Sequence, residues 1–310
     1  MAERQILVES LAEIPERLPV YLAVGVFDGV HLGHQQLLRQ MVAEAEAAGC
    51  VPAVLTFFPH PARVIRGATG RYYLNRPHER TTYLAELGIR LIVLQTFDDA
   101  FRQIRAADFV QLLRQHLDLR QLWGSDFSLG YQGKGDYDFL RQQGEAFDFV
   151  VRRLEIKAEV AGEPVSSSRI RQALAEGDIP LANRCLTRPF QLVGPVIKGA
   201  QRGRTLNFPT ANMGIWDEQV LPATGVYACT IKVGDEVFRA ATNLGYRPTV
   251  NGHNLAVEPH ILDFDRNIYD EEVALSFLER IRPEMKFNGL DELKAQIGRD
   301  VAYVRQHLAL

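Results

Sequence analysis

The sequence predicts an α/β domain with a doubly wound parallel sheet, followed by a small antiparallel β-barrel that ends in a helix. Three observations predict this arrangement. Apolar runs alternate with amphipathic stretches up to about residue 154, short β-like runs punctuated by Gly, Pro and Asn follow residue 190, and an apolar stripe at helical spacing closes the chain. With 310 residues, the chain is long enough for two domains.

The first half shows the alternation that is typical of βαβ units. The runs predicted as strands are residues 20–26, 51–58, 90–97, 119–124 and 147–154. The stretches predicted as helices are residues 32–48, 77–87, 107–116, 137–143 and 168–176. Gly177 ends the last helix, because glycine readily takes the left-handed conformation found at helix ends. Residues 186–189 are predicted as the junction, so that the domains span residues 1–184 and 185–310.

The second half lacks helices between its β-like runs, which favours an antiparallel barrel or sandwich. Gly234 and Asp235 predict a hairpin, with Gly in the first position, as a type II′ turn requires. The predicted strands are residues 226–233, 236–244, 255–264 and 272–281. A final helix carries an apolar stripe that we expect to pack on the barrel: Leu290, Leu293, Ile297, Val301, Val304 and Leu308.

The composition argues against several classes of partner. A net charge of −3 gives no reason to expect nucleic acid or membrane binding, and no apolar stretch reaches transmembrane length. The three cysteines are scattered, which is typical of reduced thiols in the cytosol rather than of disulfides or a metal cluster. We therefore expect a cytoplasmic protein without a targeting signal that acts on small molecules, as a monomer or a weak homo-oligomer.

The turn at residues 25–34 is the strongest functional signal. It follows a predicted buried strand and opens a predicted helix, with His31 and His34 in the first turn. Helix N-termini attract phosphate through backbone N–H groups and the helix dipole, and Gly29 lets a phosphate approach closely. Two imidazoles there could stabilise charge on a reacting phosphate. The alternatives are a chance surface pair or half of a metal site, although no Cys or third His lies near in the sequence.

Three further stretches in the first half fit a bound nucleotide. Residues 56–61 and 123–127 end two predicted strands, so both lie at the carboxyl edge of the sheet, where ligands bind. Their aromatic residues can equally be core residues. Residues 166–171 place hydroxyls before a helix and arginines directly after them, which suits a pyrophosphate. The alternative there is an ordinary Ser N-cap with solvated arginines.

The second half has its own phosphate-compatible loop, in which glycines are interspersed with basic residues from Lys198 to Arg204. Thr210 and Asn212 follow on an extended segment, where residues two apart point the same way, and their oxygens suit Mg²⁺. Glu258 lies among apolar residues of a predicted strand and could accept a proton from a substrate hydroxyl. An isolated Glu on a strand can also be a solvated edge residue.

Eight motifs, taken in order, together resemble those of the bifunctional riboflavin kinase/FAD synthetase family of prokaryotes. The resemblance is collinear over nearly the whole chain, and it is specific because the motifs fall in both predicted domains. The motifs are residues 25–35, 56–61, 124–127, 166–171, 208–212, 225–228, 243–249 and 282–287.

The resemblance implies a Rossmann-like nucleotidyltransferase domain that adenylylates FMN to FAD and a barrel that phosphorylates riboflavin. ATP is the implied co-substrate of both, Mg²⁺ the implied cofactor, and Glu258, His31 and His34 the implied catalytic residues. ATP in the first domain would contact Gly25, Phe27, Gly29, His31, His34, Ser167, Ser168 and Arg171. The flavin and adenylylation site would include Asp28, Phe57, Pro59, Asp126 and Phe127. In the barrel, the phosphate loop would include Lys198, Gly199, Gly203 and Arg204, and the metal ligands would be Thr210 and Asn212.

The chain departs from the usual pattern of that family at three places. Ser128 and Leu129 stand where Arg and Phe are common, Ser168 replaces Thr, and Asn207 stands where Gly precedes Phe-Pro. The first pair puts flavin or ATP affinity at the adenylylation site in question, whereas Ser168 keeps its hydroxyl. The alternatives to a bifunctional enzyme are a riboflavin kinase that transfers adenylyl groups poorly and a flavin-binding regulator or carrier.

Overall fold

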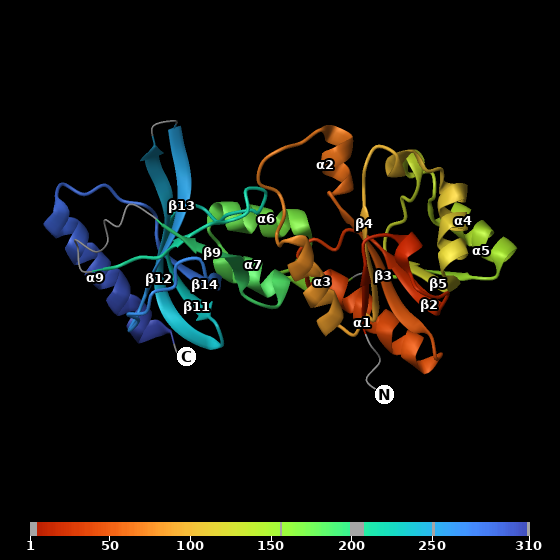
Figure 1. Cartoon of the computed structure of the whole chain (residues 1–310), viewed down its shortest axis with the longest axis horizontal. Helices are drawn as coiled ribbons and strands as arrows, with labels where there is room; N and C mark the ends of the chain where they lie inside the picture. Colours follow the sequence, from red (N-terminus) through yellow and green to blue (C-terminus); the bar gives the residue numbers. More distant parts are fainter. Residues whose placement is uncertain (1–4, 156, 199–207, 250–251, 309–310) are drawn as a thin grey trace. The chain divides into compact units, whose positions relative to one another are not determined.

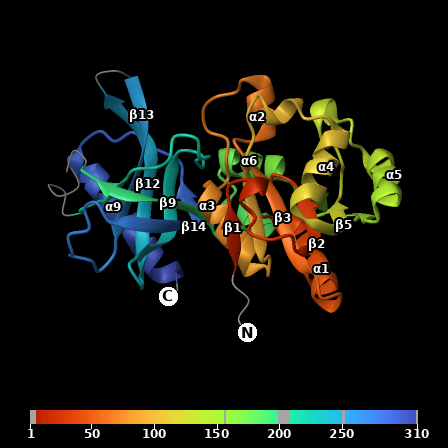
Figure 2. The same ribbon diagram turned by 45° about the vertical axis from the view of Figure 1, so that its right-hand side comes forward.

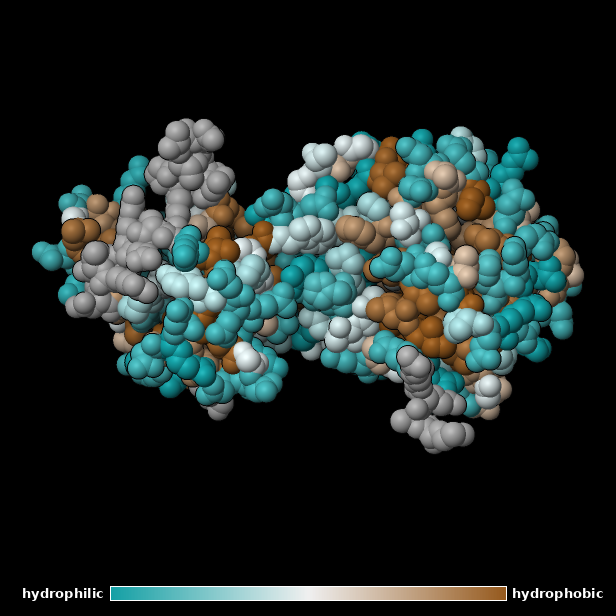
Figure 3. Space-filling view, in the orientation of Figure 1, coloured by the Kyte–Doolittle hydropathy of each residue, from teal (hydrophilic) through white to brown (hydrophobic). Residues whose placement is uncertain are grey.

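The computed structural model describes residues 5–155, 157–198, 208–249 and 252–308. The chain divides into two compact units, the first comprising Met1–Gly70 and Arg76–Val165 and the second Arg71–Asn75 and Ser166–Leu310. Within the described ranges, no helix is long and apolar enough to cross a membrane. Hydrophilic side chains cover much of the face drawn in Figure 3.

The first unit is built on a six-stranded sheet with the order β1-β4-β3-β2-β5-β6, in which every neighbouring pair is parallel (Figure 1). Its strands are β1 (Ile6–Val8), β2 (Pro19–Val24), β3 (Val51–Phe58), β4 (Leu91–Thr96), β5 (Asp118–Gly124) and β6 (Val150–Arg153). From β2 the chain adds β3 and β4 on one side and then β5 and β6 on the other. The order therefore reverses between β2 and β5, and doubly wound sheets bind ligands at the carboxyl ends of the strands beside this point.

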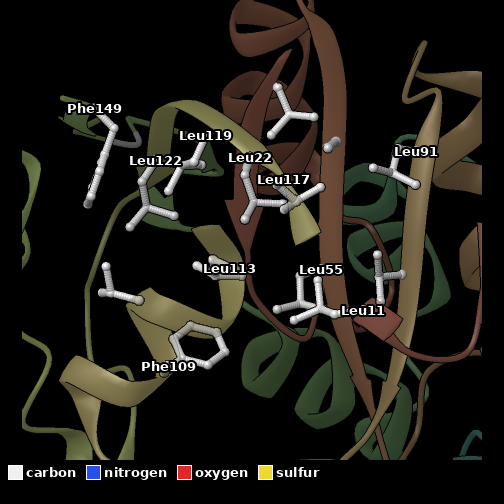
Figure 4. Packing of buried hydrophobic residues seen from close by; sticks show 14 of the residues in the cluster. Leu11, Leu22, Leu55, Leu91, Phe109, Leu113, Leu117, Leu119, Leu122 and Phe149 are labelled. Carbon is white, nitrogen blue, oxygen red and sulfur yellow. The ribbon is translucent and has the colours of Figure 1, made fainter. Parts of the chain in front are cut away.

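Helices cover both faces of this sheet, and the predicted doubly wound architecture is confirmed. On one face, Leu22 packs with Phe109 and Leu113, as Figure 4 shows. On the other face, Val54 packs with Leu38 in a second cluster. The helices of this unit are α1 (Leu32–Ala47), α2 (Pro61–Arg66), α3 (Pro77–Glu86), α4 (Ala106–His116) and α5 (Tyr137–Phe147), with 3-10 turns η1 (Leu11–Glu13), η2 (Phe101–Gln103) and η3 (Tyr131–Gly133).

The first unit differs from the prediction in several details, among them helix α2 (Pro61–Arg66), which was not predicted, and two strands of the sheet. The strand predicted to begin at Phe147 begins at Val150, because α5 continues to Phe147 and Asp148 then takes a left-handed conformation with φ of 59°. Strand β1 is absent from the predicted strands because its three residues are too few to form a periodic pattern. The short hairpin of β7 (Glu159–Val160) and β8 (Glu163–Pro164) completes the unit.

The second unit contains a closed barrel with the strand order β10-β13-β12-β11-β14-β9, and all paired neighbours are antiparallel. Its strands are β9 (Phe190–Ile197), β10 (Asn212–Met213), β11 (Gly225–Val233), β12 (Glu236–Thr249), β13 (Gly252–Ile261) and β14 (Glu272–Arg282). Gly234 has a positive φ of 58° between β11 and β12, as the predicted turn requires. Helix α9 (Leu290–His307) lies outside the barrel (Figure 2). Its residue Val304 packs with Ala228 and Ala241 of the barrel. The predicted barrel with a terminal helix is confirmed.

Two helices from the predicted first domain pack within this second unit. They are α6 (Ser167–Glu176) and α7 (Ile179–Leu186). The side chain of Asn183 donates to the carbonyl of Phe277 (2.9 Å) and accepts from the backbone N–H of Phe190 (2.7 Å), which ties α7 to β14 and β9. Packing therefore divides the chain after Val165, whereas the predicted boundary at residues 184 and 185 concerns the two activities and stays a prediction.

The segment Arg71–Asn75 also belongs to the second unit, although its neighbours in sequence on both sides belong to the first. The backbone N–H groups of Tyr72 and Tyr73 both donate to the carbonyl of Glu218 (2.7 and 3.0 Å). The ring of Tyr73 stacks on Trp216 with 5.0 Å between centroids. The guanidinium of Arg71 also donates to the carbonyls of Trp216 (3.1 Å) and Gln219 (2.9 Å), so backbone bonds, side-chain bonds and an aromatic stack together hold the segment.

Candidate active sites

A strained turn joins β2 to α1 at the carboxyl edge of the parallel sheet. Phe27, Gly29 and Val30 have positive φ angles of 53°, 81° and 40°, a region that only glycine enters freely. The N–H of Val30 donates to the carbonyl of Phe27 (3.0 Å), and the side-chain amide of Gln35 donates to the carbonyl of Val30 (2.9 Å). A β-branched residue at positive φ is costly, and such strain is concentrated at functional sites.

His31 and His34 lie side by side at the opening of α1, as the sequence predicts. His31 is the N-cap residue, and its ring stacks on that of His34 with centroids 3.6 Å apart and an interplanar angle of 19°. Phe27 meets His34 edge-on at 5.2 Å. Desolvation lowers the pKa of His34 well below its usual value near 6.5, and the charges of His31 and Arg80 lower this pKa further. His34 is therefore neutral at pH 7.

The metal-site alternative for this pair gains no support. Across the ranges that the structure describes, no group of three or more His, Cys, Asp or Glu residues gathers to hold a metal ion. The buried Nδ1 of His34 has no hydrogen-bond partner among the described residues. This ring nitrogen therefore keeps its hydrogen-bonding capacity unused by the described protein groups.

The loop after β5 reaches the same edge of the sheet. The ring of Phe127 lies over Gly124, where an added Cβ would come within 2.9 Å of the ring, and its centroid is 6.1 Å from that of Tyr137. The ring of Phe127 thus packs against the end of β5 and Tyr137. Asp126 next to it has a side chain that is 92 % exposed, with Arg153 at 3.8 Å. The carboxylate of Asp126 is therefore accessible, whereas Asp28, in the turn after β2, is buried.

A pocket of about 630 Å³ opens in the first unit beside the loop that follows β3. Of the five residues predicted for the flavin and adenylylation site, Phe57 lines it. Ser128 and Leu129, the positions where the chain departs from the resemblance, also line it. Aromatic side chains form part of the pocket wall, and they are Phe57, Phe97, Phe101, Phe109 and Tyr131.

Ser167, Ser168 and Arg171 lie on α6 and so belong to the second unit. The N-cap of α6 is Ser166, whose hydroxyl accepts from the backbone N–H of Arg169 (3.2 Å), so the capping alternative holds for that residue. Arg171 is not simply solvated. Its Nε donates to the carbonyl of Tyr72 (2.7 Å), and its guanidinium lies 4.1 Å from the centroid of the Tyr72 ring. The roles predicted for these residues stay predictions.

On the barrel, Asn212, Glu258 and Asn243 share one face across three neighbouring strands. Asn243 of β12 stands opposite Glu258 of β13. The Met213–Val257 pair between β10 and β13 places Asn212 opposite Glu258 on the other side. The intervening residues Met213 and Val257 are buried, and Asn243 shares its side of β12 with Ala241, which packs under α9. The three polar residues therefore lie on the outer face of the barrel.

The remaining residues predicted for the barrel site are placed only in part. Thr210 is half-buried, two residues before Asn212. Lys198 is exposed directly after β9. Gly199, Gly203 and Arg204 of the predicted phosphate loop lie outside the described residues.

A second carboxylate reaches this outer face. A Cβ added to Gly245 would collide with the carboxylate of Glu284 and would come within 3.4 Å of the amide nitrogen of Asn243. Glu284 therefore lies over bare backbone beside Asn243. It follows Arg282, whose guanidinium binds Asp300 of α9 through Nε (3.0 Å) and a terminal nitrogen (2.8 Å). The side chains of Arg282 and Asp300 are only 14 % and 4 % exposed.

Comparison with known proteins matches both halves of the chain. The model of the FAD synthetase family matches residues 14–169, and that of the riboflavin kinase family matches residues 186–308. Three relatives are named bifunctional riboflavin kinase/FMN adenylyltransferase. Their sequences are 37%, 34% and 35% identical to this chain in Haemophilus influenzae, Bacillus subtilis and Escherichia coli K12, respectively. These alignments cover 90%, 92% and 98% of this chain and 91%, 91% and 97% of the relatives. The chain belongs to the bifunctional riboflavin kinase/FMN adenylyltransferase family.

A solved structure supports the fold of this family member over its whole length. The crystal structure of a Streptococcus pneumoniae protein titled macrolide-efflux protein has a TM-score of 0.86 and 28% identity, covering 98% of this chain and 99% of that one. The sequence-based prediction of an FAD synthetase half followed by a riboflavin kinase half is confirmed by the family matches. We refer to these halves below as the adenylyltransferase half and the kinase half.

One residue of the adenylyltransferase half and two of the kinase half lie at these sites without having been predicted from the sequence. Arg80 of α3 is buried, and its guanidinium donates to the carbonyl of Val26 (2.6 Å), next to the strained turn. A charged residue on a helix is usually solvated, so its type and position gave no signal. Asn243 and Glu284 fall within two of the eight motifs, and this membership was the signal that could have singled them out.

Proposed function

We propose that the chain makes FAD from riboflavin in two successive ATP-dependent reactions, one in each half. The kinase half phosphorylates riboflavin to FMN, and the adenylyltransferase half transfers the adenylyl group of a second ATP to FMN. The observation that carries the proposal is the stacked His31–His34 pair at the opening of α1, on the sheet edge that also bears an aromatic-walled pocket. The two family matches support both reactions.

In the adenylylation, an oxygen of the FMN phosphate attacks the α-phosphorus of ATP. The bond from that phosphorus to the bridging β-phosphate oxygen breaks, and pyrophosphate leaves with the bonding electron pair. The attacking phosphate is already anionic, so no protein nucleophile is needed, and positioning and charge stabilisation supply the catalysis. The backbone of Gly25, Phe27 and Gly29 and the rings of His31 and His34 would contact the phosphates of ATP.

The low pKa of His34 fits this role. A desolvated neutral imidazole can donate one N–H to a phosphate oxygen, and the negative charge of a bound triphosphate favours the protonated form. The ring would therefore gain a proton as the charge arrives. Ser167, Ser168 and Arg171 would hold the pyrophosphate through hydroxyl and guanidinium donors.

The pocket in the adenylyltransferase half suits the flavin ring of FMN. Its volume of about 630 Å³ falls in the usual range for a small-molecule site, and aromatic walls favour a flat ring system. Phe57 and Tyr131 are among its walls, with Leu129 in place of the common Phe. Pro59, Asp28, Asp126 and Phe127 remain predicted members of the adenylylation site.

In the kinase half, the terminal ribityl hydroxyl of riboflavin attacks the γ-phosphorus of ATP. Glu258 accepts the hydroxyl proton, the bond from the γ-phosphorus to the bridging oxygen breaks, and ADP leaves. Lys198, Gly199, Gly203 and Arg204 would bind the phosphates. The place of Glu258 between Asn212 and Asn243 on the outer face supports its role as the base.

The residues present fit Mg²⁺. Thr210 and Asn212 offer hydroxyl and amide oxygens, which are hard donors, and Glu258 stands opposite Asn212 in the strand register. The described residues contain no cluster of three acidic, His or Cys ligands, so the ion would take further ligands from ATP phosphates. When bound, Mg²⁺ would neutralise phosphate charge.

The partners that we propose are small molecules: riboflavin, FMN, FAD and ATP. Nucleic acid and membranes are not expected partners, because the net charge is −3 and no basic surplus is present. We also propose a cytoplasmic location and a monomer or weak homo-oligomer. The three cysteines are buried free thiols, which suits a reducing compartment.

A chromatographic time course with riboflavin, ATP and Mg²⁺ tests the proposal by resolving riboflavin, FMN and FAD. FMN that rises first and is then converted to FAD is the expected result. FMN that accumulates without FAD would leave a riboflavin kinase only and would direct attention to Ser128 and Leu129. Formation of neither product, with flavin still bound, would favour a binding protein.

A further inference from the structure

Arg80 is a buried cation that no step proposed above uses. It lies on α3, its exposed fraction is 1 %, and it belongs to the same compact unit as the His31–His34 pair. One terminal nitrogen of its guanidinium donates to the carbonyls of Val26 (2.6 Å) and Phe57 (3.3 Å). Acceptors of this kind stabilise a charge that is removed from water, so the two carbonyls help to hold the guanidinium of Arg80 in its place.

The two carbonyls belong to the places where neighbouring strands end. Val26 follows β2 and directly precedes Phe27, the first residue of the turn with a positive φ. Phe57 is the penultimate residue of β3. Thr56 adds a second donor to the Val26 carbonyl, since its hydroxyl donates to that oxygen at 2.8 Å and also lies 3.3 Å from the Arg80 guanidinium. The carbonyl of the Val26–Phe27 peptide, at the start of the strained turn, therefore accepts hydrogen bonds from two side chains.

The same turn determines where the imidazoles lie. Phe27 contacts the His34 ring edge-on, and His34 stacks on His31, so a shift of the Val26 peptide passes to both rings through direct contacts. Electrostatics links the residues as well. Desolvation is the largest cause of the low pKa of His34, and the charges of His31, at the end of the turn, and of Arg80, on α3, lower this pKa further. Asp28, a further charged residue of the turn, is buried.

We propose that Arg80 is a positioning residue for adenylylation: its guanidinium fixes the turn at residues 25–30 and thereby the places of the His31 and His34 rings, without contacting the nucleotide. The inference rests on the proposed function of the adenylyltransferase half. A displacement of catalytic groups by about 1 Å can cost about 100-fold in rate. Loss of the hydrogen bond from Arg80 to the Val26 carbonyl should therefore have a measurable effect on the rate.

The test compares Arg80→Lys and Arg80→Gln in the full chain with a matched control, Arg90→Gln. Arg90 also donates from its guanidinium to a backbone carbonyl, that of Cys50 (3.3 Å), but just before β3 begins, at the opposite edge of the sheet. FAD formation from supplied FMN is measured with its KM for ATP and its pH profile. Riboflavin phosphorylation by the same preparation reports whether the kinase half is intact.

We expect Arg80→Lys to lower kcat for FAD formation by about 10- to 100-fold, with riboflavin phosphorylation unchanged. In Arg80→Gln, loss of the positive charge raises the pKa of His34, so the corresponding apparent pKa in the pH profile moves to higher pH. Arg90→Gln is expected to change neither kcat for FAD formation nor the apparent pKa in the pH profile. A lost contact that only supported folding would lower the melting temperature without moving the pH profile.

If the Arg80 variants do not fold, Thr56→Val removes the other donor to the Val26 carbonyl at similar volume, and Thr56→Ser restores it. The expected result is slower FAD formation in the first and recovery in the second. If the unsubstituted chain makes FAD and the folded Arg80 and Thr56 variants match it in rate and pH profile, the positioning inference is wrong. If the unsubstituted chain makes no FAD at all, the proposed adenylylation is wrong and this inference fails with it.

Discussion

The buried ion pair between Arg282 and Asp300 gives the sharpest prediction about stability. Asp300 accepts from two nitrogens of Arg282, and from the amide of Gln296 at 2.9 Å. Arg282 is the last residue of β14, and the chain continues from it to Glu284 on the outer face of the barrel. Replacing Asp300 with Ala removes one charge and leaves the guanidinium of Arg282 largely enclosed.

The expected cost follows from the geometry. Removing one partner of a buried ion pair costs about 3–5 kcal/mol, because the other charge remains without compensation. The lower end of this range applies, since Arg282 is 14 % exposed and part of its guanidinium can reach water. A loss of about 3 kcal/mol corresponds to a fall in melting temperature of roughly 6–12 °C for a unit of this size.

The assay uses the two tryptophans of the chain, one in each compact unit. Trp123→Phe leaves Trp216, which stacks on Tyr73 in the second unit, as the sole indole reporter. Urea unfolding of that variant, followed by Trp216 fluorescence, is compared with the same variant carrying Asp300→Ala, Arg282→Met or both. The double substitution removes both charges of this pair, so we expect it to be less destabilising than the two single changes added together.

Two results would refute this reasoning. An Asp300→Ala chain whose Trp216 transition occurs at the unchanged urea concentration would mean that the ion pair contributes nothing. Additive effects of the two substitutions would mean that Arg282 and Asp300 do not interact energetically. Riboflavin phosphorylation should decline with Asp300→Ala even in the folded chain, since the segment that carries Glu284 loses its anchor.

Three further predictions concern single side chains. Glu258→Gln should lower riboflavin phosphorylation by about 100-fold or more while riboflavin KM and FAD formation from supplied FMN stay unchanged; unchanged turnover would remove Glu258 from the role of base. Unfolding by urea between pH 7.5 and 5.5 should show stability falling below about pH 6.5, because the unfolded chain protonates His34 and the folded chain does not. His34→Phe should reduce this dependence, and an identical pH dependence would contradict the low pKa. Gly130→Ala should raise KM for FMN, since Gly130 lines the pocket, its φ is 70°, and an added Cβ would lie 2.5 Å from the backbone of Ala106. Gly162→Ala is the control, because Gly162 has a φ of 77° but open space around it, so the substitution should cost only backbone strain, about 1–2 kcal/mol in unfolding free energy. If Gly162→Ala raised KM for FMN as much as Gly130→Ala does, a steric clash at Gly130 could not be the cause of the increase.

The elements were predictable where burial imposes a period on the sequence. The apolar runs of the parallel sheet and the alternation of the barrel strands arise because whole faces of these elements lack water, so side-chain type follows position. The His31–His34 pair was predictable because it follows a buried strand and opens a helix. In these cases a local pattern contains the information needed to place the residue.

Other features depend on contacts that leave no local pattern. Residues 71–75 join the second unit through backbone bonds to Glu218 and through side-chain contacts with residues about 145 positions away, such as that of Arg71 with Gln219, so no nearby residue signals the pairing. Arg80 and Asp300 are charged residues in helices, where solvation is the usual state, and their burial depends on acceptors or donors far away in sequence. Glu284 approaches Asn243 only because Gly245 lacks a side chain.

The membership of residues 71–75 in the second unit has a consequence during protein synthesis. Leu74 hydrogen-bonds with Gln219, which lies 145 residues further along the chain. At about 5–20 residues per second, a ribosome needs roughly 7–30 s to make that intervening length. During this time the first unit can complete its sheet. Tyr72 and Tyr73 meanwhile lack the backbone acceptor at Glu218, and Tyr73 lacks its stacking partner Trp216. Until residues 216–219 are made, the nascent chain would therefore carry an aromatic stretch without its partners in the middle of a folded unit, and transiently exposed surface of this kind favours aggregation.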